Sequence, residues 1–403
     1  MGATTTDVFD PASIDLLDGR WYTDDPHTAW RWMRANTPVF HDERNDVFAI
    51  TRYDDLVRVE RDPATFSSHS GIRPHTWHSP IMIHLDPPEH VRRRKLVNRG
   101  FTPRAVRQLE TKLRSLVDTL IDDVVDRGEC DFVADLAAWL PLIVIADLLG
   151  FDPADRPALL EWSDDLMRAT TATDDAARVK GHDAHLHYDA YIRRLLAQRR
   201  AAPARHDDLL DKLMTAEVDG ERLDDFTIVE ESMLILIGGD ETTRHVMTGG
   251  LVALLEHPDQ LAALAAHPDR IPVAVEELLR WVSPIKNMNR TVTRDTELHG
   301  VRLPAGAQVL LFYPSANRDE RVFADPDRFD TTRDPNPHVA FGAPSHHFCL
   351  GANLARLELR VFFEHLLARM PDIRLADGAA LPLRASNFIV GIESMPVVWT
   401  PPR

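Results

Sequence analysis

Apolar positions recur at helical spacing through most of the chain. Between residues 103 and 127 they follow one another at intervals of three and four, which places them on one stripe of a helix. The stripe consists of Val106, Leu109, Leu113, Leu116, Leu120 and Val124. Similar spacing predicts helices over 271–281 and 354–370, and a very long helix over 224–255 that begins at the N-cap residue Asp224.

Short runs of strand-forming residues occur near the two ends of the chain. They predict strands over 47–51, 309–313, 388–391 and 396–400. The polar segment 170–187, rich in Ala and His, is typical of a mobile lid. Because we find no internal repeat and no flexible linker, we expect residues 1–403 to form a single domain that is mainly α with a small β region.

Composition narrows the classes of function. No apolar run approaches the roughly 18 residues of a spanning helix, and the N-terminus lacks the features of a signal peptide, so we expect a cytoplasmic protein without integral membrane association. Two cysteines exclude a four-cysteine iron–sulfur or zinc site within the chain. A net charge of -17 disfavours nucleic-acid binding.

One cysteine, Cys349, lies in a Gly- and Pro-containing loop directly before a predicted helix. A helix N-terminus stabilises an anion, so a thiolate there suits an axial iron ligand. Gly351 leaves room for a flat macrocycle against the backbone. Taken alone, Cys349 is more often a buried structural cysteine.

The long predicted helix contains Gly238 and Gly239 in its middle, followed by Asp240, Glu241 and Thr242. Each glycine costs about 1 kcal/mol relative to alanine inside a helix, so the pair serves close packing or a functional purpose. Gly238 and Thr242 share a face, which offers space and a hydroxyl to a small ligand. Taken alone, close helix packing is the better explanation.

The loop resembles the cytochrome P450 signature at Phe341, Cys349, Gly351 and Ala355, although Pro344 stands where that family usually has glycine. The run from Gly238 to Thr242 is similar to the family's oxygen-activation motif. The resemblance implies the P450 fold, a helical body with a long central helix over haem b and a minor β-sheet subdomain. It implies that Cys349 binds the iron, that Gly238, Phe341 and Gly351 contact the cofactor, and that Glu241 and Thr242 deliver protons.

Further residues gain a role through this resemblance. Glu277 and Arg280 lie three apart and are similar to the family's buried Glu-x-x-Arg motif, which Arg328 would join as a structural cluster. The haem carboxylates need cations. By motif position these are His90, Arg94, Arg290 and His347; each alone is also consistent with a solvated surface charge, and only their combination indicates a carboxylate site.

Five segments, 70–74, 92–101, 234–245, 281–290 and 387–396, are similar to those of actinobacterial P450s that oxidise the side chain of cholesterol and cholest-4-en-3-one. This resemblance implies hydroxylation of a terminal methyl and further oxidation to the carboxylic acid. The expected substrate contacts are apolar: Ile72, Met82, Ile83, Leu234, Ile237, Gly238, Ile285, Ile389 and Val390. Each of them taken singly is more often ordinary core.

A basic stretch interrupts the acidic chain at Arg92, Arg93, Lys95 and Arg99. It is either a solvated face or, as in the family, the docking site of an acidic ferredoxin that a ferredoxin reductase supplies with electrons. Three alternatives to a sterol monooxygenase stay open. They are a hydroxylase of methyl-branched fatty acids or terpenoids, a haem-binding sensor without turnover, and a helical interaction protein. The Glu241–Thr242 pair argues against the sensor.

Overall fold

The computed structural model describes residues 10–402 except 77–78, 173, 203–205 and 219. Its helices are α1 (His27–Asn36), α2 (Tyr53–Arg61), α3 (Glu89–Asn98), α4 (Pro103–Gln108), α5 (Glu110–Val125), α6 (Trp139–Leu149), α7 (Arg156–Ala169), α8 (Asp175–Ala201), α9 (Leu209–Thr215), α10 (Asp225–Leu255), α11 (Pro258–Ala266), α12 (Ile271–Val282), α13 (Tyr313–Ala316) and α14 (Ala352–Arg369). Its strands are β1 (Val39–Asp42), β2 (Val47–Ile50), β3 (Phe66–Ser67), β4 (Glu129–Asp131), β5 (Glu217–Val218), β6 (Glu221–Arg222), β7 (Asn287–Val292), β8 (Thr296–Leu298), β9 (Val301–Leu303), β10 (Gln308–Phe312), β11 (Arg374–Leu375) and β12 (Pro396–Val398). The prediction of a mainly α fold with a small β region is confirmed.

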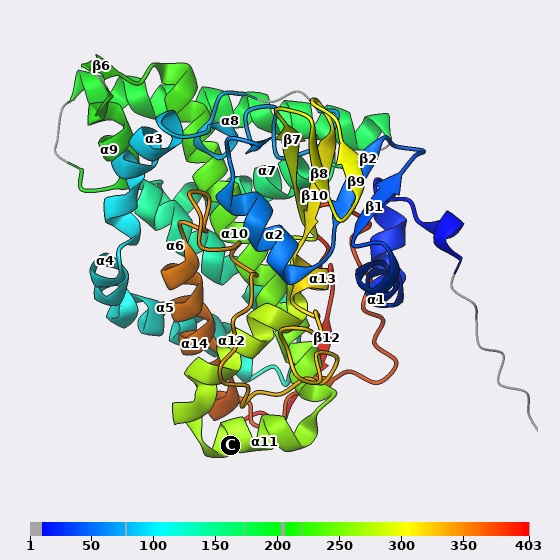
Figure 1. Ribbon diagram of the computed structural model, residues 1–403. Coiled ribbons are helices and arrows are strands. Elements are labelled where there is room, and N and C mark those ends of the chain that lie inside the picture. Colours follow the sequence, from blue (N-terminus) through cyan, green and yellow to red (C-terminus); the bar gives the residue numbers. More distant parts are fainter. Residues whose placement is uncertain (1–9, 77–78, 173, 203–205, 219, 403) are drawn as a thin grey trace, which may run out of the picture.

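Helix α10 runs through the middle of the helical body (Figure 1). Asp224 caps it as predicted, because its carboxylate accepts the Thr227 N–H at 2.8 Å. The two central glycines serve different purposes. A Cβ on Gly239 would lie 2.8 Å from Cγ1 of Ile145 on α6, so this glycine permits close helix packing, whereas a Cβ on Gly238 would meet no atom within 4 Å.

The main sheet has the strand order β1-β2-β10-β7-β3 and lies at one side of the helical body (Figure 1). Strands β2 and β10 are parallel, and the other neighbours are antiparallel. The strands predicted over 47–51, 309–313 and 396–400 are present as β2, β10 and β12. The strand predicted over 388–391 is wrong: Ile389 forms only an isolated bridge, and the amides of Phe388 and Ile389 bond the Ser386 hydroxyl.

Two helical predictions differ in detail. The stripe over 103–127 is divided at Leu109 into α4 and α5, while Val106 and Leu113 remain buried. Most of the polar segment 170–187 belongs to α8, which starts after Asp174 and packs against α7. Gly181 permits this approach, since a Cβ there would lie 2.1 Å from that of Ala169. The exposed polar residues of this segment therefore lie on the outer face of α8, the helix that packs against α7.

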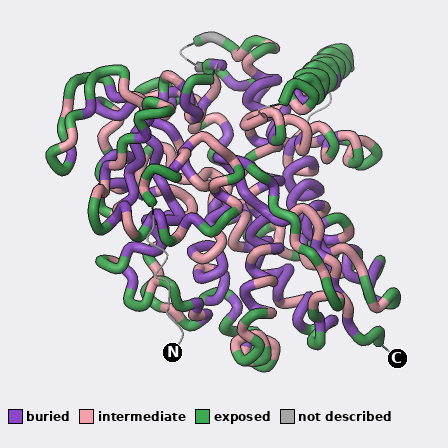
Figure 2. Tube along the Cα trace, turned by 90° about the vertical axis from the view of Figure 1, so that its right-hand side faces the viewer, coloured by how far each residue is buried: buried purple, intermediate pink, exposed green. Residues whose placement is uncertain are grey.

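Buried residues concentrate along the interior of the helical body, and exposed residues form its outer turns (Figure 2). The largest apolar cluster joins side chains of α5, α6, α10, α12 and α14, and smaller clusters lie around the main sheet. Within the described residues, no helix is both long and apolar enough to cross a membrane.

Candidate active site

Cys349 lies immediately before α14, in a loop that returns to Phe341. The Cys349 N–H donates to the Phe341 carbonyl at 2.9 Å. Burial raises the pKa of the Cys349 thiol, whereas the N–H groups of Gly351 and Ala352 and the Arg94 guanidinium oppose that rise. A bound metal cation adds the charge that favours the thiolate, so the loop is suited to a metal ligand.

Four basic side chains gather beside this loop: His90 and Arg94 of α3, Arg290 of β7 and His347. The ring centroids of His90 and His347 are 4.2 Å apart. Nδ1 of His90 and Nε2 of His347 are buried without a partner among the described residues. The pKa of His90 is lowered to about 4 and that of His347 to about 2, chiefly by burial and in part by the nearby Arg94 and Arg290 guanidinium groups. Orphaned ring nitrogens beside two guanidinium groups favour an anionic ligand.

The glycines next to these groups leave open backbone faces. A Cβ on Gly351 would meet no atom within 4 Å, which is also true of Gly238 on α10. Thr242 lies one turn after Gly238 and donates its hydroxyl to the Gly238 carbonyl at 3.1 Å. A thiol, two open glycine faces and a cluster of basic side chains fit haem, a flat macrocycle with an iron atom and two carboxylates.

Glu241 is fully buried and paired with three basic side chains. Nη2 of Arg244 forms a short hydrogen bond to it, while His245 Nε2 and Arg384 Nη1 each lie 3.1 Å from Oε2. Asp164 of α7 extends the network, since its Oδ1 lies 2.7 Å from Arg244. Burial alone would raise the pKa of Glu241, but Arg244, His245 and Arg384 hold it well below the ordinary value. Glu241 is therefore an ionised acceptor, and sequence reasoning missed Asp164 and Arg384.

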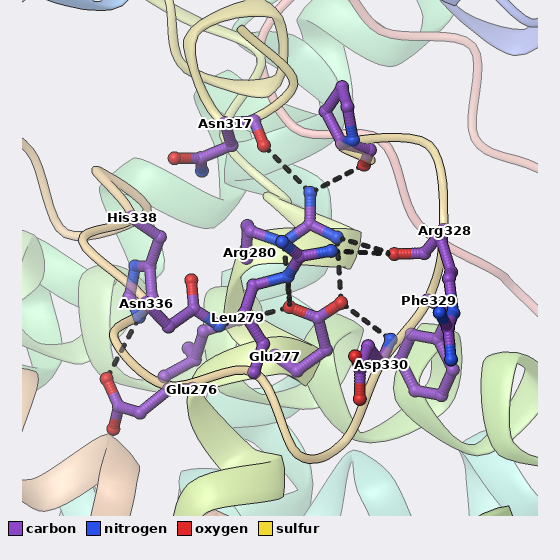
Figure 3. Close-up of polar contacts among 12 residues, drawn as sticks. Glu276, Glu277, Leu279, Arg280, Asn317, Arg328, Phe329, Asp330, Asn336 and His338 are labelled. Atoms are coloured by element: carbon purple, nitrogen blue, oxygen red, sulfur yellow. Dashed lines mark hydrogen bonds and ion pairs between the residues drawn. The ribbon is translucent and has the colours of Figure 1, made fainter. Parts of the chain in front are cut away.

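Glu277 and Arg280 of α12 form a buried pair with two hydrogen bonds of 2.7 Å (Figure 3). The prediction that the Arg328 side chain joins them is wrong. That side chain is exposed, and Arg328 contributes its carbonyl, which accepts from Arg280 at 3.2 Å (Figure 3). The next residue, Phe329, is buried, so the chain turns Arg328 outward. The second cation is Arg333, whose Nε lies 3.3 Å from Glu277 Oε2.

Four of the predicted substrate contacts meet in one small apolar cluster. They are Ile72, Ile237, Ile285 and Ile389, joined by Met167, Met288 and Phe388, which the sequence did not single out. Met82 and Leu234 lie in the large core cluster, and Ile83 is half-buried beside Met82. The placement of Val390 in the substrate site is wrong. It packs with Trp30 and Phe312 in another cluster, because successive residues of an extended segment point to opposite sides.

The basic stretch on α3 is not one exposed surface. Lys95 and Arg92 are exposed, and the side chain of Arg99 lies outside the described residues. Arg93 was expected at the docking surface, but its side chain is 14% exposed and its Nη1 lies 3.0 Å from Glu231 on α10. Helical rotation of about 100° per residue turns it inward.

A cysteine loop, the basic side chains beside it and a threonine one turn from an open glycine fit the class of haem-thiolate proteins. Comparison with known proteins gives the family: residues 164–370 match the model described as Cytochrome P450. The chain belongs to the cytochrome P450 family, whose cofactor is haem b.

Within the family, two relatives and one solved structure are similar to this chain over most of its length. A "Steroid C26-monooxygenase" of Mycolicibacterium smegmatis is 51% identical, with 98% of each chain covered. A "Methyl-branched lipid omega-hydroxylase" of Mycobacterium tuberculosis is 40% identical over 92% of this chain and 87% of its own. The structure of Mycobacterium marinum CYP268A2 in complex with pseudoionone superposes with a TM-score of 0.88 at 34% identity, covering 98% of this chain and 100% of that one.

Proposed function

We propose that this P450 oxidises the terminal side-chain methyl of sterols such as cholesterol and cholest-4-en-3-one, first to the alcohol and then to the carboxylic acid. The observation that carries the proposal is the 51% identity, over nearly the whole chain, to a relative named steroid C26-monooxygenase. The apolar cluster around Ile237 and Ile389, with the open face of Gly238 on the same helix as Ile237, supports a lipophilic substrate.

Haem, when bound, supplies oxygen activation, in which one atom of O2 enters a C–H bond and the other leaves as water, consuming two electrons and two protons. Cys349 would hold the iron, and His90, Arg94, Arg290 and His347 would bind the carboxylates. The apolar cluster would exclude water and orient the methyl group. Phe341 packs under the Arg356 guanidinium at 4.6 Å and fixes the loop that carries Cys349.

The proton-delivering pair would act unequally. The Thr242 hydroxyl lies on the open face of α10, where it can hold a proton-donating water. Glu241 is ionised, because Arg244, His245 and Arg384 hold its pKa well below the ordinary carboxyl value. It would therefore pass protons on without storing them.

Electrons would come from a small acidic ferredoxin and its reductase, with docking near the exposed Arg92 and Lys95 of α3. Arg93 is excluded from this surface by its pairing with Glu231. A cytoplasmic location remains a prediction from the sequence.

A comparative titration of the purified holoprotein tests the substrate. We expect cholest-4-en-3-one to shift the haem spectrum at lower concentration than a methyl-branched fatty acid. With ferredoxin, reductase and NAD(P)H, turnover should give the terminal alcohol and acid. Preferential binding and ω-hydroxylation of the branched fatty acid would instead support the second candidate, which the 40% identical relative favours. If the protein binds haem but forms no product that depends on the reductant, the result would instead support a haem-binding sensor without turnover.

A further inference from the structure

Residues 79–85 connect α10 with the loop between Phe341 and Cys349, called the haem loop below. The Ser79 hydroxyl donates to Glu230 of α10 at 2.6 Å, and the Met82 N–H donates to Oε1 of Glu231 at 2.8 Å. At the other end of the segment, the Leu85 carbonyl accepts a hydrogen bond from His347. The segment therefore lies between a helix that borders the apolar cluster and the loop that carries Cys349.

Glu231 also joins this segment to α3. Its Oε1, which accepts the Met82 N–H, lies 3.0 Å from Nη1 of Arg93. The side chain of Glu231 is 3% exposed and that of Arg93 is 14% exposed, so water screens the pair weakly. A second carboxylate near Arg93 is Glu89, which is 3.8 Å away and 59% exposed.

We propose that Glu231 is a positioning residue that, with Arg93, holds Met82 against α10 and thereby sets the affinity of the site for its substrate. The proposal rests on the proposed function, because Met82 and Ile83 are candidate substrate contacts. It assigns Arg93 to the substrate side of the molecule, although its sequence neighbours suggest the docking surface.

The charges around Glu231 make this contact depend on pH. The pKa of Glu231 is raised to about 7, because burial and the nearby Glu230 carboxylate raise it more than Arg93 and the Met82 N–H lower it. Asp224 faces Arg93, and His185 of α8 lies 3.6 Å from Glu230. Below pH 7 Glu231 is neutral and loses its attraction to Arg93, so substrate affinity should weaken as the pH falls through about 7.

We expect the Glu231→Gln protein to fold, because burial disfavours the charge that this change removes. The pKa of the carboxyl is higher in the folded protein than the ordinary value of 4.5, so its ionisation lowers stability as the pH rises between these values. A neutral side chain of the same shape removes that cost. Glu89→Gln is the matched control, since it removes the exposed partner of the same arginine.

The test measures the cholest-4-en-3-one Kd of the holoenzymes on both sides of pH 7. We expect wild type and Glu89→Gln to bind more weakly at low pH. We expect Glu231→Gln to bind about tenfold more weakly than wild type at high pH, a difference of about 1.4 kcal/mol, with little pH dependence. Its KM should rise far more than its kcat falls, and Arg93→Gln should behave alike.

A Glu231→Gln enzyme with the wild-type Kd and its pH dependence would overturn the proposal, as would an Arg93→Gln enzyme with unaltered sterol affinity if Glu231→Gln fails to load haem. If wild type does not bind the sterone, the proposed substrate is wrong. The same comparison with a methyl-branched fatty acid then decides the role of Glu231.

Discussion

Two arginines of one loop, Arg328 and Arg333, should differ sharply when each is replaced by alanine. Arg333 lies 3.3 Å from the buried Glu277 carboxylate and donates to the carbonyls of Ala324 and Asp325 at 2.8 and 3.2 Å. Arg328 has an exposed side chain, and its useful carbonyl survives in the Arg328→Ala variant. Comparing the two variants therefore distinguishes the loss of a buried charge partner of Glu277 from the loss of an exposed arginine nearby in the sequence.

The expected loss of unfolding free energy depends on which partners the Glu277 carboxylate keeps in each variant. Removing one partner of a buried ion pair costs about 3–5 kcal/mol when the other charge is uncompensated. Glu277 keeps two hydrogen bonds from Arg280, one from the Asp330 N–H at 2.9 Å and one from the Asn336 amide at 3.0 Å, so we expect the low end, about 3 kcal/mol, for Arg333→Ala. An exposed substitution changes stability by about 0.5 kcal/mol at most, which is the expectation for Arg328→Ala.

Urea unfolding of both holoproteins measures the difference, and the reduced carbon monoxide difference spectrum measures how much haem each retains. Arg333→Ala should unfold at lower urea and yield less haem-loaded protein, and Arg328→Ala should match wild type. Equal destabilisation by the two changes would refute the assignment of Arg333 to the cluster.

Further substitutions test the glycines and the buried network. Gly391→Ala should lower the Tm strongly, because the new Cβ would lie 1.8 Å from Nδ1 of His245, whereas Gly238→Ala should keep the Tm and weaken substrate binding, since its Cβ enters open space. Arg384→Gln removes one of the groups that hold down the pKa of Glu241. Its loss of unfolding free energy should be largest at neutral pH. The loss should vanish only when the pH falls through the depressed pKa of Glu241, well below the ordinary carboxyl value, because only there is Glu241 protonated in the folded wild-type protein.

The features that the sequence predicted well depend on local rules. The long helix follows from its periodicity and from Asp224 at its start, and the cysteine loop follows from a motif whose residues are close in sequence. The open face of Gly238 was also predictable, because residues four apart share a helix face. These predictions needed no knowledge of how distant segments pack.

The errors have a common physical origin in long-range packing. Arg328 and Arg333 lie in an irregular loop, where no period decides which side chain points inward. Arg384 reaches Glu241 across 143 residues, so no pattern near Glu241 reveals this third basic partner, whereas Arg244 and His245 lie three and four residues on along the same helix. Val390 was assigned with Ile389 to one site, but an extended backbone sends neighbours to opposite sides.

Helix α3 shows how one run of basic residues serves separate purposes. Arg94 donates to the carbonyls of His346 and Phe348 in the haem loop at 3.1 and 2.5 Å, Arg93 contacts α10, and Lys95 is exposed. Because each residue turns the helix by about 100°, neighbours in the sequence reach different parts of the molecule.

Arg93 and Lys95, the two neighbours of Arg94, should therefore affect different measured constants when each is replaced. Lys95→Glu should raise the KM for an acidic ferredoxin, most strongly at low salt, and leave the sterol Kd unaltered, because an exposed charge acts mainly on the encounter rate. Arg93→Gln should weaken sterol binding and leave the KM for ferredoxin close to wild type. If Arg93→Gln instead raises the KM for ferredoxin and Lys95→Glu has no effect, the inward orientation of Arg93 is wrong, and with it the division of the basic run between cofactor, substrate and redox partner.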